Sequence, residues 1–268
     1  MNNPAIAVPA FRGAYSPAPR HQRAPQRRPV SFISVMGELL ITAGAVALIF
    51  LVWQTWINPS VLRIQHHNQA ADLSQQWGDG QTIPTAADER TDPGDPIVDE
   101  APGYAEAFGT LIIPRFGDDF VLPLAESVDL YDVLDTQGAG HYAGTQMPGG
   151  IGNFAVAAHR TGGGDPFYDI DKLRLGDSIY VETQAGWYRY VYRSLEYVYA
   201  SGIGVLNPVP QVDNMLPTDR LMTLTSCNPV HTADERIIAY AVYDTWYPRA
   251  DGAPAEIASL VNALNSTD

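Results

Sequence analysis

A long apolar run lies near the beginning of the chain. Residues 39–57 (LLITAGAVALIFLVWQTWI) carry no charge. As a helix this stretch would be about 29 Å long, which is the thickness of the hydrocarbon core of a bilayer. We therefore expect a membrane-spanning helix over residues 36–57, with Trp53 and Trp56 near an interface at its end. A buried core helix or a cleaved signal peptide is the alternative, but no clean small-residue cleavage site follows.

The pattern changes on both sides of this run. Residues 1–35 are rich in Pro and Ala and show no apolar periodicity, so we expect a disordered arm. Residues 59–77 have only loosely helical apolar spacing, and residues 78–103 are dense in Pro, Gly, Asp and Thr. The pattern therefore predicts a stalk and linker over residues 58–103, with a short helix at its start.

From residue 104 onward the hydrophobic period is mostly two, which is typical of strands. Turn residues separate the expected strands, and Pro123 is expected to stop the second of them. The strands cover residues 108–113, 120–124, 153–159, 178–183, 187–199, 221–227 and 236–246. Strands of this length, with turn signals between them, indicate a closed or nearly closed β-barrel.

This barrel domain is expected over residues 104–249. Short helices or turns are expected within it at residues 128–134 and 167–173. The tail, residues 250–268, has apolar residues at helical spacing, which predicts either a short terminal helix or a frayed end.

The charge of the chain is unevenly distributed. Its 268 residues include 16 Lys+Arg and 30 Asp+Glu, with a formal net charge of −14. This acidic balance argues against nucleic acid as a partner. Five arginines precede the apolar run, whereas 29 of the 30 acidic residues follow it. The positive-inside rule therefore predicts a cytoplasmic N-terminus and an acidic body outside the cell membrane.

The chain has one cysteine, Cys227, so an intramolecular disulfide and a multi-cysteine zinc site are excluded. Cys227 ends a predicted strand (TLTSC), and Pro229 turns the chain directly afterwards. In an oxidising compartment a lone cysteine can be an inert buried residue, an intermolecular cross-link or a reactive thiol.

Two further residues with catalytic chemistry lie at strand ends. His159 ends one predicted strand, and Arg236 begins the strand after that of Cys227. If the last two strands are antiparallel neighbours, all three side chains could meet at one rim of the barrel. A nearby cation favours the thiolate, an imidazole exchanges protons, and a guanidinium can hold an oxyanion. The set suits acyl transfer through a thioester, although each residue alone is also compatible with a structural role.

Together these motifs resemble the sortase family. TLTSC-N-P followed by Arg236, with GHYAGTQMPGGIGNFAVAAHRTG upstream, is similar to the family's TLxTC, arginine and histidine motifs, with Ser226 where threonine is commoner. The apolar run and the HYAGT segment with Tyr142 resemble actinobacterial class E members. The resemblance implies a closed eight-stranded β-barrel with short helices, preceded by one transmembrane helix, on the outer face of a Gram-positive bacterium.

The resemblance also implies an activity. A sortase is a cysteine transpeptidase that cuts a sorting signal of the LPXTG type, or LAXTG in class E, between Thr and Gly. Cys227 would form the thioacyl enzyme, His159 would transfer protons, and Arg236 would hold the oxyanion. The second substrate would be an amine of the lipid-linked peptidoglycan precursor or, in a pilin-polymerising enzyme, a lysine. No organic cofactor is implied, and no clustered acidic loop suggests calcium or another metal.

Several neighbouring residues are candidates for substrate binding. Tyr142 resembles a groove residue that favours Ala over Pro in the signal; the alternative is a packing aromatic. Of Thr225 and Ser226, one should face the groove, because successive strand residues point to opposite faces. His141 and His231 are alternative catalytic histidines, but they lack the strand-end position that the family pattern favours.

Two other protein classes are alternatives. A cell-wall L,D-transpeptidase would need an SHGC motif, which this sequence lacks. A non-catalytic, membrane-anchored extracellular binding domain with a buried cysteine stays open, and the accessibility of Cys227 separates it from a cysteine enzyme.

Overall fold

The computed structural model describes residues 31–78, 83–85, 93–230 and 232–266. Helix α1 (Phe32–Val52) contains no buried residue. Among the described residues it is the one helix long and apolar enough to cross a membrane. It begins four residues before the expected span and gives way to one turn of π-helix, η1 (Trp53–Ile57). The chain divides into two compact units, residues 1–49 and residues 50–268.

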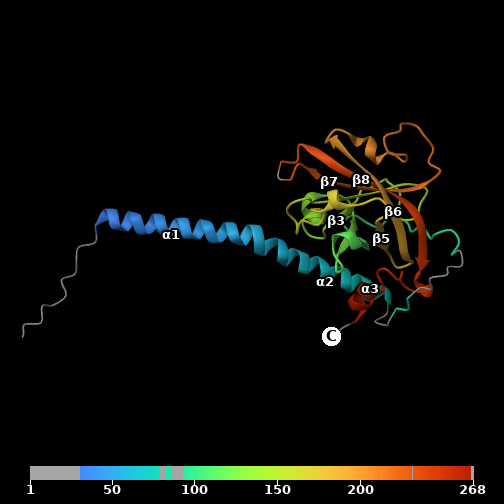
Figure 1. The fold of residues 1–268 in the computed structure, drawn as a ribbon, viewed down its shortest axis with the longest axis horizontal. Coiled ribbons are helices and arrows are strands. Elements are labelled where there is room, and N and C mark those ends of the chain that lie inside the picture. Colours follow the sequence, from blue (N-terminus) through green and yellow to red (C-terminus); the bar gives the residue numbers. More distant parts are fainter. Residues whose placement is uncertain (1–30, 79–82, 86–92, 231, 267–268) are drawn as a thin grey trace, which may run out of the picture. The chain divides into compact units, whose positions relative to one another are not determined.

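The second unit contains a closed barrel of eight strands, in the order β1-β2-β3-β4-β7-β8-β6-β5 (Figure 1). The strands are β1 (Ala107–Ile112), β2 (Val121–Glu126), β3 (Ala139–His141), β4 (Gly152–Ala158), β5 (Ser178–Glu182), β6 (Gly186–Tyr199), β7 (Arg220–Asn228) and β8 (Glu235–Pro248). The pairs β2–β3 and β4–β7 are parallel, and the other neighbours are antiparallel. The structure therefore confirms the predicted closed eight-stranded barrel, which follows an apolar helix in the sequence.

Short helical turns connect the strands. They are η2 (Pro114–Phe116), η3 (Leu130–Leu134), η4 (Ile170–Lys172), η5 (Ile203–Leu206) and η6 (Arg249–Asp251). The expected helices or turns at residues 128–134 and 167–173 contain η3 and η4. At the end of the chain, α3 (Ala258–Asn265) buries Leu260, Val261 and Leu264.

Strand β2 continues through Pro123, although a stop was expected there. It pairs with β1 along Val121–Glu126, but its parallel partner β3 begins only opposite Leu124. Pro123 therefore lies where β2 has a neighbouring strand on one side, a position at which a residue without an N–H is tolerated. Strand β3 itself was not predicted, because three residues with a central glycine carry no readable alternation.

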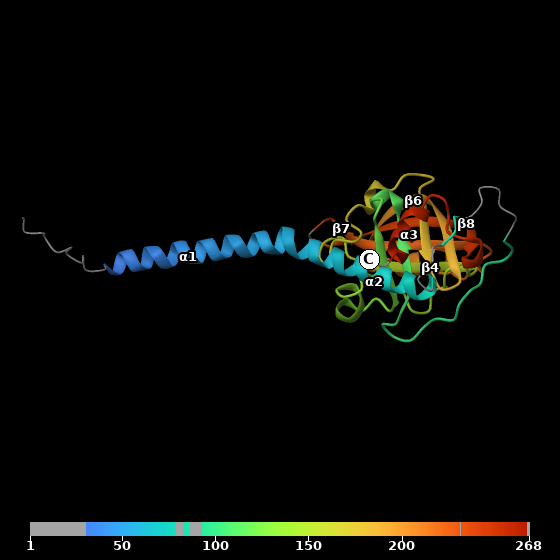
Figure 2. The same cartoon turned by 90° about the horizontal axis from the view of Figure 1, so that it is seen from below.

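A helix packs on the barrel where the sequence indicates a stalk. Helix α2 covers Asn58–Gly78 and buries His66, Ala70 and Ser74, which lie four residues apart on one face. Figures 1 and 2 show α2 beside α3 at the barrel, and residues of the two helices are in contact. Residues 58–78 are therefore part of the folded unit, because a mixed polar and small face provides the packing surface.

A buried carboxylate connects α2 to the barrel wall. Glu182 of β5 is fully buried, and burial raises its pKa. Its carboxylate accepts hydrogen bonds from Ser74 Oγ (3.1 Å) and Thr110 Oγ1 (3.2 Å), and it pairs with Arg249 (3.0 Å). Because a buried charge is costly unless it is paired, these contacts determine where α2 lies against β1 and β5.

Alternation fixes which side chains fill the barrel. The interior cluster includes Phe154, Val156 and Ala158 of β4, Met222 and Leu224 of β7, and Ile237, Ala239 and Ala241 of β8. Since successive strand residues point to opposite faces, the residues between these project from the outside of the barrel. This sets the face on which the candidate site lies.

Candidate active site

The three strand-end residues meet at one end of three adjacent strands. In the parallel pair β4–β7, Ala157 lies opposite Thr225. Two residues further along the same pair come His159 and Cys227. In the antiparallel pair β7–β8, Cys227 lies directly opposite Arg236. Directly opposed residues have Cα atoms about 4.5–5.5 Å apart, so the thiol, the imidazole and the guanidinium share one neighbourhood.

These side chains project from the outer face of the barrel. Their chain neighbours Ala158 and Ile237 point into the interior cluster. Cys227 is partly exposed, and the His159 side chain is 17% exposed. The site is therefore open to solvent, in contrast to the setting of an inert core cysteine.

A carboxylate that the sequence did not reveal holds the histidine. His159 Nε2 donates to Asp135 Oδ1 at 2.7 Å. Asp135 directly follows η3, whose first turn is capped by Asp129. Because this bond places the Nε2 proton on the carboxylate side, Nδ1 of the neutral ring can accept a proton. Asp135 lies 24 residues before His159, and no local pattern connects the two.

The backbone after His159 packs against its ring. A Cβ added to Gly163 would lie 2.7 Å from His159 Cδ2 and 3.1 Å from the carbonyl oxygen of Leu134. Gly163 also has a φ of +55°, where a side chain is disfavoured. A glycine is therefore needed here for the loop to support the imidazole.

A network of hydrogen bonds and one ion pair connects the residues next to the three candidate catalytic residues. Arg160 is 5% exposed. Its Nη1 donates to Asn228 Oδ1 (3.0 Å) and its Nη2 pairs with Asp171 (2.9 Å). Asn228 Nδ2 in turn donates to Glu235 Oε2 (3.0 Å). Each of the three candidate catalytic residues has one member of this network as its neighbour in sequence, namely Arg160, Asn228 or Glu235. The network therefore fixes the relative positions of the three strand ends.

Arg236 is oriented by the loop before β8. Its Nη1 donates to the carbonyl oxygens of Ala233 and Glu235, both at 2.9 Å. A guanidinium carries five N–H donors, so others are available for an oxyanion.

Two of the three candidate substrate-binding residues come together on the outer face. The hydroxyl groups of Tyr142 and Thr225 lie 2.9 Å apart. Thr225 precedes Cys227 by two residues and so shares its face of β7. Ser226 does not join them, because its Oγ donates to the carbonyl oxygen of Ala158 at 2.7 Å and the residue is buried.

Of the two alternative histidines, the structure describes His141. His141 is fully buried and its Nδ1 lies 2.6 Å from Glu126 Oε2. It stacks on Phe154 inside the barrel, which gives it a structural environment. His231 lies outside the described residues. Within the part of the chain that the structure describes, no group of three or more His, Cys, Asp or Glu could hold a metal ion.

Comparisons with known proteins point to one family. The model of the Sortase domain matches residues 111–244. Sortase SrtE1 of Streptomyces coelicolor is 34% identical over 230 residues, which cover 84% of this chain and 60% of SrtE1. Sortase SrtE2 of the same organism is 31% identical over 233 residues, which cover 82% of this chain and 85% of SrtE2.

A solved structure gives the same result. The crystal structure of Sortase E1 from Streptomyces coelicolor with a tripeptide in the active site matches with a TM-score of 0.53 and 36% identity. The match covers 59% of this chain and 99% of that chain.

Proposed function

The chain belongs to the sortase family of transpeptidases, and we propose that it cleaves a sorting signal of the LAXTG or LPXTG type between Thr and Gly and transfers the protein to an amine. The observation that carries this proposal is the meeting of Cys227, His159 and Arg236 on the outer face of β4, β7 and β8. A related sortase E1 is described with a tripeptide in its active site, which supports a peptide substrate.

The first half-reaction forms a thioester. The Cys227 sulfur gives its proton to His159 and attacks the carbonyl carbon of Thr in the signal, forming a C–S bond. Arg236 N–H groups stabilise the tetrahedral oxyanion. When this intermediate collapses, the Thr–Gly C–N bond breaks and His159 returns the proton to the leaving glycine amine.

The second half-reaction transfers the acyl group. An incoming amine attacks the thioester carbon, so a new C–N bond forms and the C–S bond breaks. The amine proton passes through His159 to the departing sulfur, which restores the starting enzyme. The amine belongs to a lipid-linked peptidoglycan precursor, and water in its place would give hydrolysis.

Tyr142 and Thr225 bind the signal next to the thiol. Their paired hydroxyls lie on the face of β7 that carries Cys227, about 7 Å along the strand. This position suits the residues of the signal that precede Thr.

The chain is held in the membrane by α1, with its N-terminus in the cytoplasm and the barrel outside. The excess of arginine before the apolar run and of acidic residues after it supports this orientation.

The products of the reaction test the function. The full-length protein, in detergent micelles, is incubated with LAXTG and LPXTG peptides and a panel of amines, and the products are identified by mass spectrometry. We expect a peptide ending at Thr and joined to the added amine, together with a released glycine fragment. Intact peptides under all conditions would refute the proposal.

Asp135 is expected to position His159 for both half-reactions. We predict that Asp135→Asn lowers kcat roughly ten- to hundredfold with little change in KM, because the carboxylate orients the ring without touching the peptide. Asp132→Asn, on the same turn and paired with exposed Tyr104, is the matched control. A fall in stability with unchanged kcat would instead assign Asp135 a purely structural role.

A further inference from the structure

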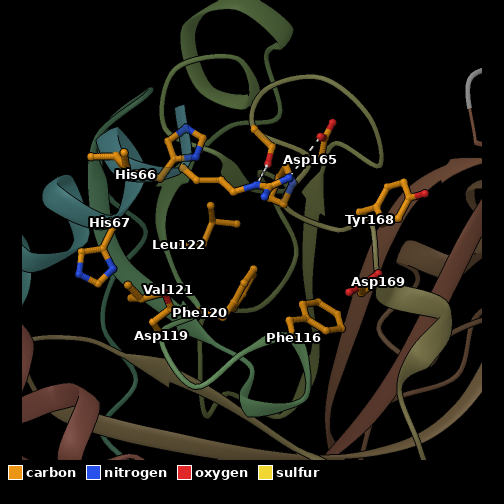
Figure 3. A pocket seen from close by; sticks show the side chains of 14 residues that line it. His66, His67, Phe116, Asp119, Phe120, Val121, Leu122, Asp165, Tyr168 and Asp169 are labelled. Carbon is orange, nitrogen blue, oxygen red and sulfur yellow. Dashed lines mark hydrogen bonds and ion pairs between the residues drawn. The ribbon is translucent and has the colours of Figure 1, made fainter. Parts of the chain in front are cut away.

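A cavity of about 520 Å³ lies between α2 and the barrel (Figure 3). Its walls come from α2, from the connection between β1 and β2, and from the connection that follows His159. Phe116 and Phe120 meet edge to face, with ring centroids 5.1 Å apart, and provide apolar surface. The volume is that of a typical ligand pocket. Cys227 and Arg236 do not line it, so it is separate from the site of covalent chemistry.

His66 gives this cavity a buried imidazole. The residue is 2% exposed and lines the cavity. Its Nε2 is buried and has no hydrogen-bond partner among the described residues. Burial lowers the pKa of His66, so the imidazole is neutral at pH 7. A neutral imidazole has one acceptor nitrogen, so His66 can accept a hydrogen bond from an N–H or O–H donor of a ligand.

The rest of the polar lining is mainly acidic. Asp119, Asp165 and Asp169 contribute carboxylates, of which Asp165 pairs with Arg63 and Asp169 with Lys172. Arg63 is the one Lys or Arg among the described lining residues, and Gly164 O (2.9 Å) and Asp165 (3.5 Å) already engage its guanidinium. Carboxylates thus outnumber Lys and Arg side chains in the described lining. The lining favours a positively charged ligand rich in N–H groups, and the aromatic rings also tolerate a cation.

The cavity shares a wall with the candidate active site. Gly163 lies against the His159 ring, and the next residue, Gly164, lines the cavity. Adjacent Cα atoms are about 3.8 Å apart, so the loop residue that contacts the imidazole and the one that lines the cavity are direct neighbours. Arg63 also follows Val52, the last residue of α1, by only 11 residues. The cavity is therefore close along the chain to the expected membrane span.

We propose that this cavity binds the peptide part of the amine acceptor, a short donor-rich chain with cationic character, while its reactive amine extends past Gly163 to the thioester on Cys227. The inference rests on the proposed function and assigns the second substrate a place on the protein. The two substrates then approach the thiol from different sides: the signal along β7, and the acceptor over the loop after His159.

Two acceptors of different length test this assignment. Full-length protein in detergent is given an LAXTG peptide with either Gly-Gly-Lys amide, which can reach the cavity, or methylamine, which cannot reach it and the thioester together. In Asp119→Asn and in His66→Leu we expect KM for Gly-Gly-Lys amide to rise roughly fivefold, the effect of one lost polar contact. KM for methylamine and the rate of glycine-fragment release should stay unchanged. Asp118→Asn is the matched control, because Asp118 is equally exposed but does not line the cavity.

Direct binding separates this inference from the proposed function. Cys227→Ala cannot form a thioester, yet it should bind Gly-Gly-Lys amide in calorimetry, and adding Asp119→Asn should weaken that binding about fivefold. Equal effects on both acceptors, an equal effect of Asp118→Asn, or binding that Asp119→Asn leaves unchanged would overturn the acceptor site. Absent thioester formation in the unaltered protein, with peptide binding intact and sensitive to Asp119→Asn, would overturn the enzyme function and leave a peptide-binding cavity.

Discussion

Cys227→Ala is expected to abolish both cleavage of the signal peptide and transfer to an amine. The sulfur is the only thiol in the chain, and no other side chain can replace it as the atom that carries the acyl group. We expect a loss of at least about 10⁴-fold in kcat/KM, the scale seen when a covalent nucleophile is removed. The measurement is the release of the glycine fragment by full-length protein, followed by mass spectrometry.

The fold should survive this change. Cys227 is partly exposed and lies on the outer face of β7, so its truncation leaves no large cavity in the barrel. The thermal unfolding midpoint of Cys227→Ala, measured in parallel, controls for misfolding. Wild-type turnover in a folded Cys227→Ala variant would contradict the mechanism.

The thiol also separates the enzyme from a non-catalytic binding domain. In a binding domain with a buried structural cysteine, a methanethiosulfonate reagent should not label the native protein. At the position observed, between the strand ends of β4 and β8, we expect Cys227 to react in the native state.

The barrel could be predicted because the local hydrophobic pattern of most of its strands agrees with their structure. Seven strands show alternation or a short apolar run bounded by turn residues, and their observed ends differ from the expected ones by at most two residues. Strand β3 was not predicted, because its three residues include Gly140 and it forms only through pairing with β2 and β4. Pairing partners distant in sequence, rather than local preference, create such a strand.

Position at strand ends was also enough to suggest that Cys227, Arg236 and His159 meet. The antiparallel pair β7–β8 follows from a short connection, and the parallel pair β4–β7 completes the set. Their catalytic roles stay predictions. Asp135 could not be found in this way, because its distance to His159 depends on how η3 folds back between β2 and β3.

Helix α2 shows why a polar segment can be misjudged. Its buried positions include His66 and Ser74, so the segment lacks the apolar stripe of an ordinary packed helix. A hydrogen bond from Ser74 to Glu182 replaces part of the missing hydrophobic contact. Glu182 is far from α2 in sequence, and so are the barrel residues that line the cavity beside His66, so neither contact could be predicted from the sequence.

Arg236→Lys is expected to remove most of the activity, although it preserves the positive charge. The guanidinium has a planar set of N–H donors. Its bonds to the carbonyl oxygens of Ala233 and Glu235 fix its orientation beside Cys227. A lysine ammonium is a single point charge on a flexible stem and cannot keep these contacts while it donates to an oxyanion. Loss of one oxyanion donor typically lowers kcat by about 10²–10³-fold, and we expect a fall of this size with KM changed much less.

The comparison with Arg193→Lys decides whether this effect belongs to the site. Arg193 is an exposed residue of β6, away from the β4–β7–β8 strand ends, so its replacement should leave kcat unchanged. Near-normal turnover in Arg236→Lys would mean that charge alone stabilises the oxyanion. A rise in KM with kcat preserved would instead place Arg236 in ground-state binding of the signal. A selective fall in kcat requires that its N–H donors act on the transition state, because only contacts that strengthen there accelerate the chemical step.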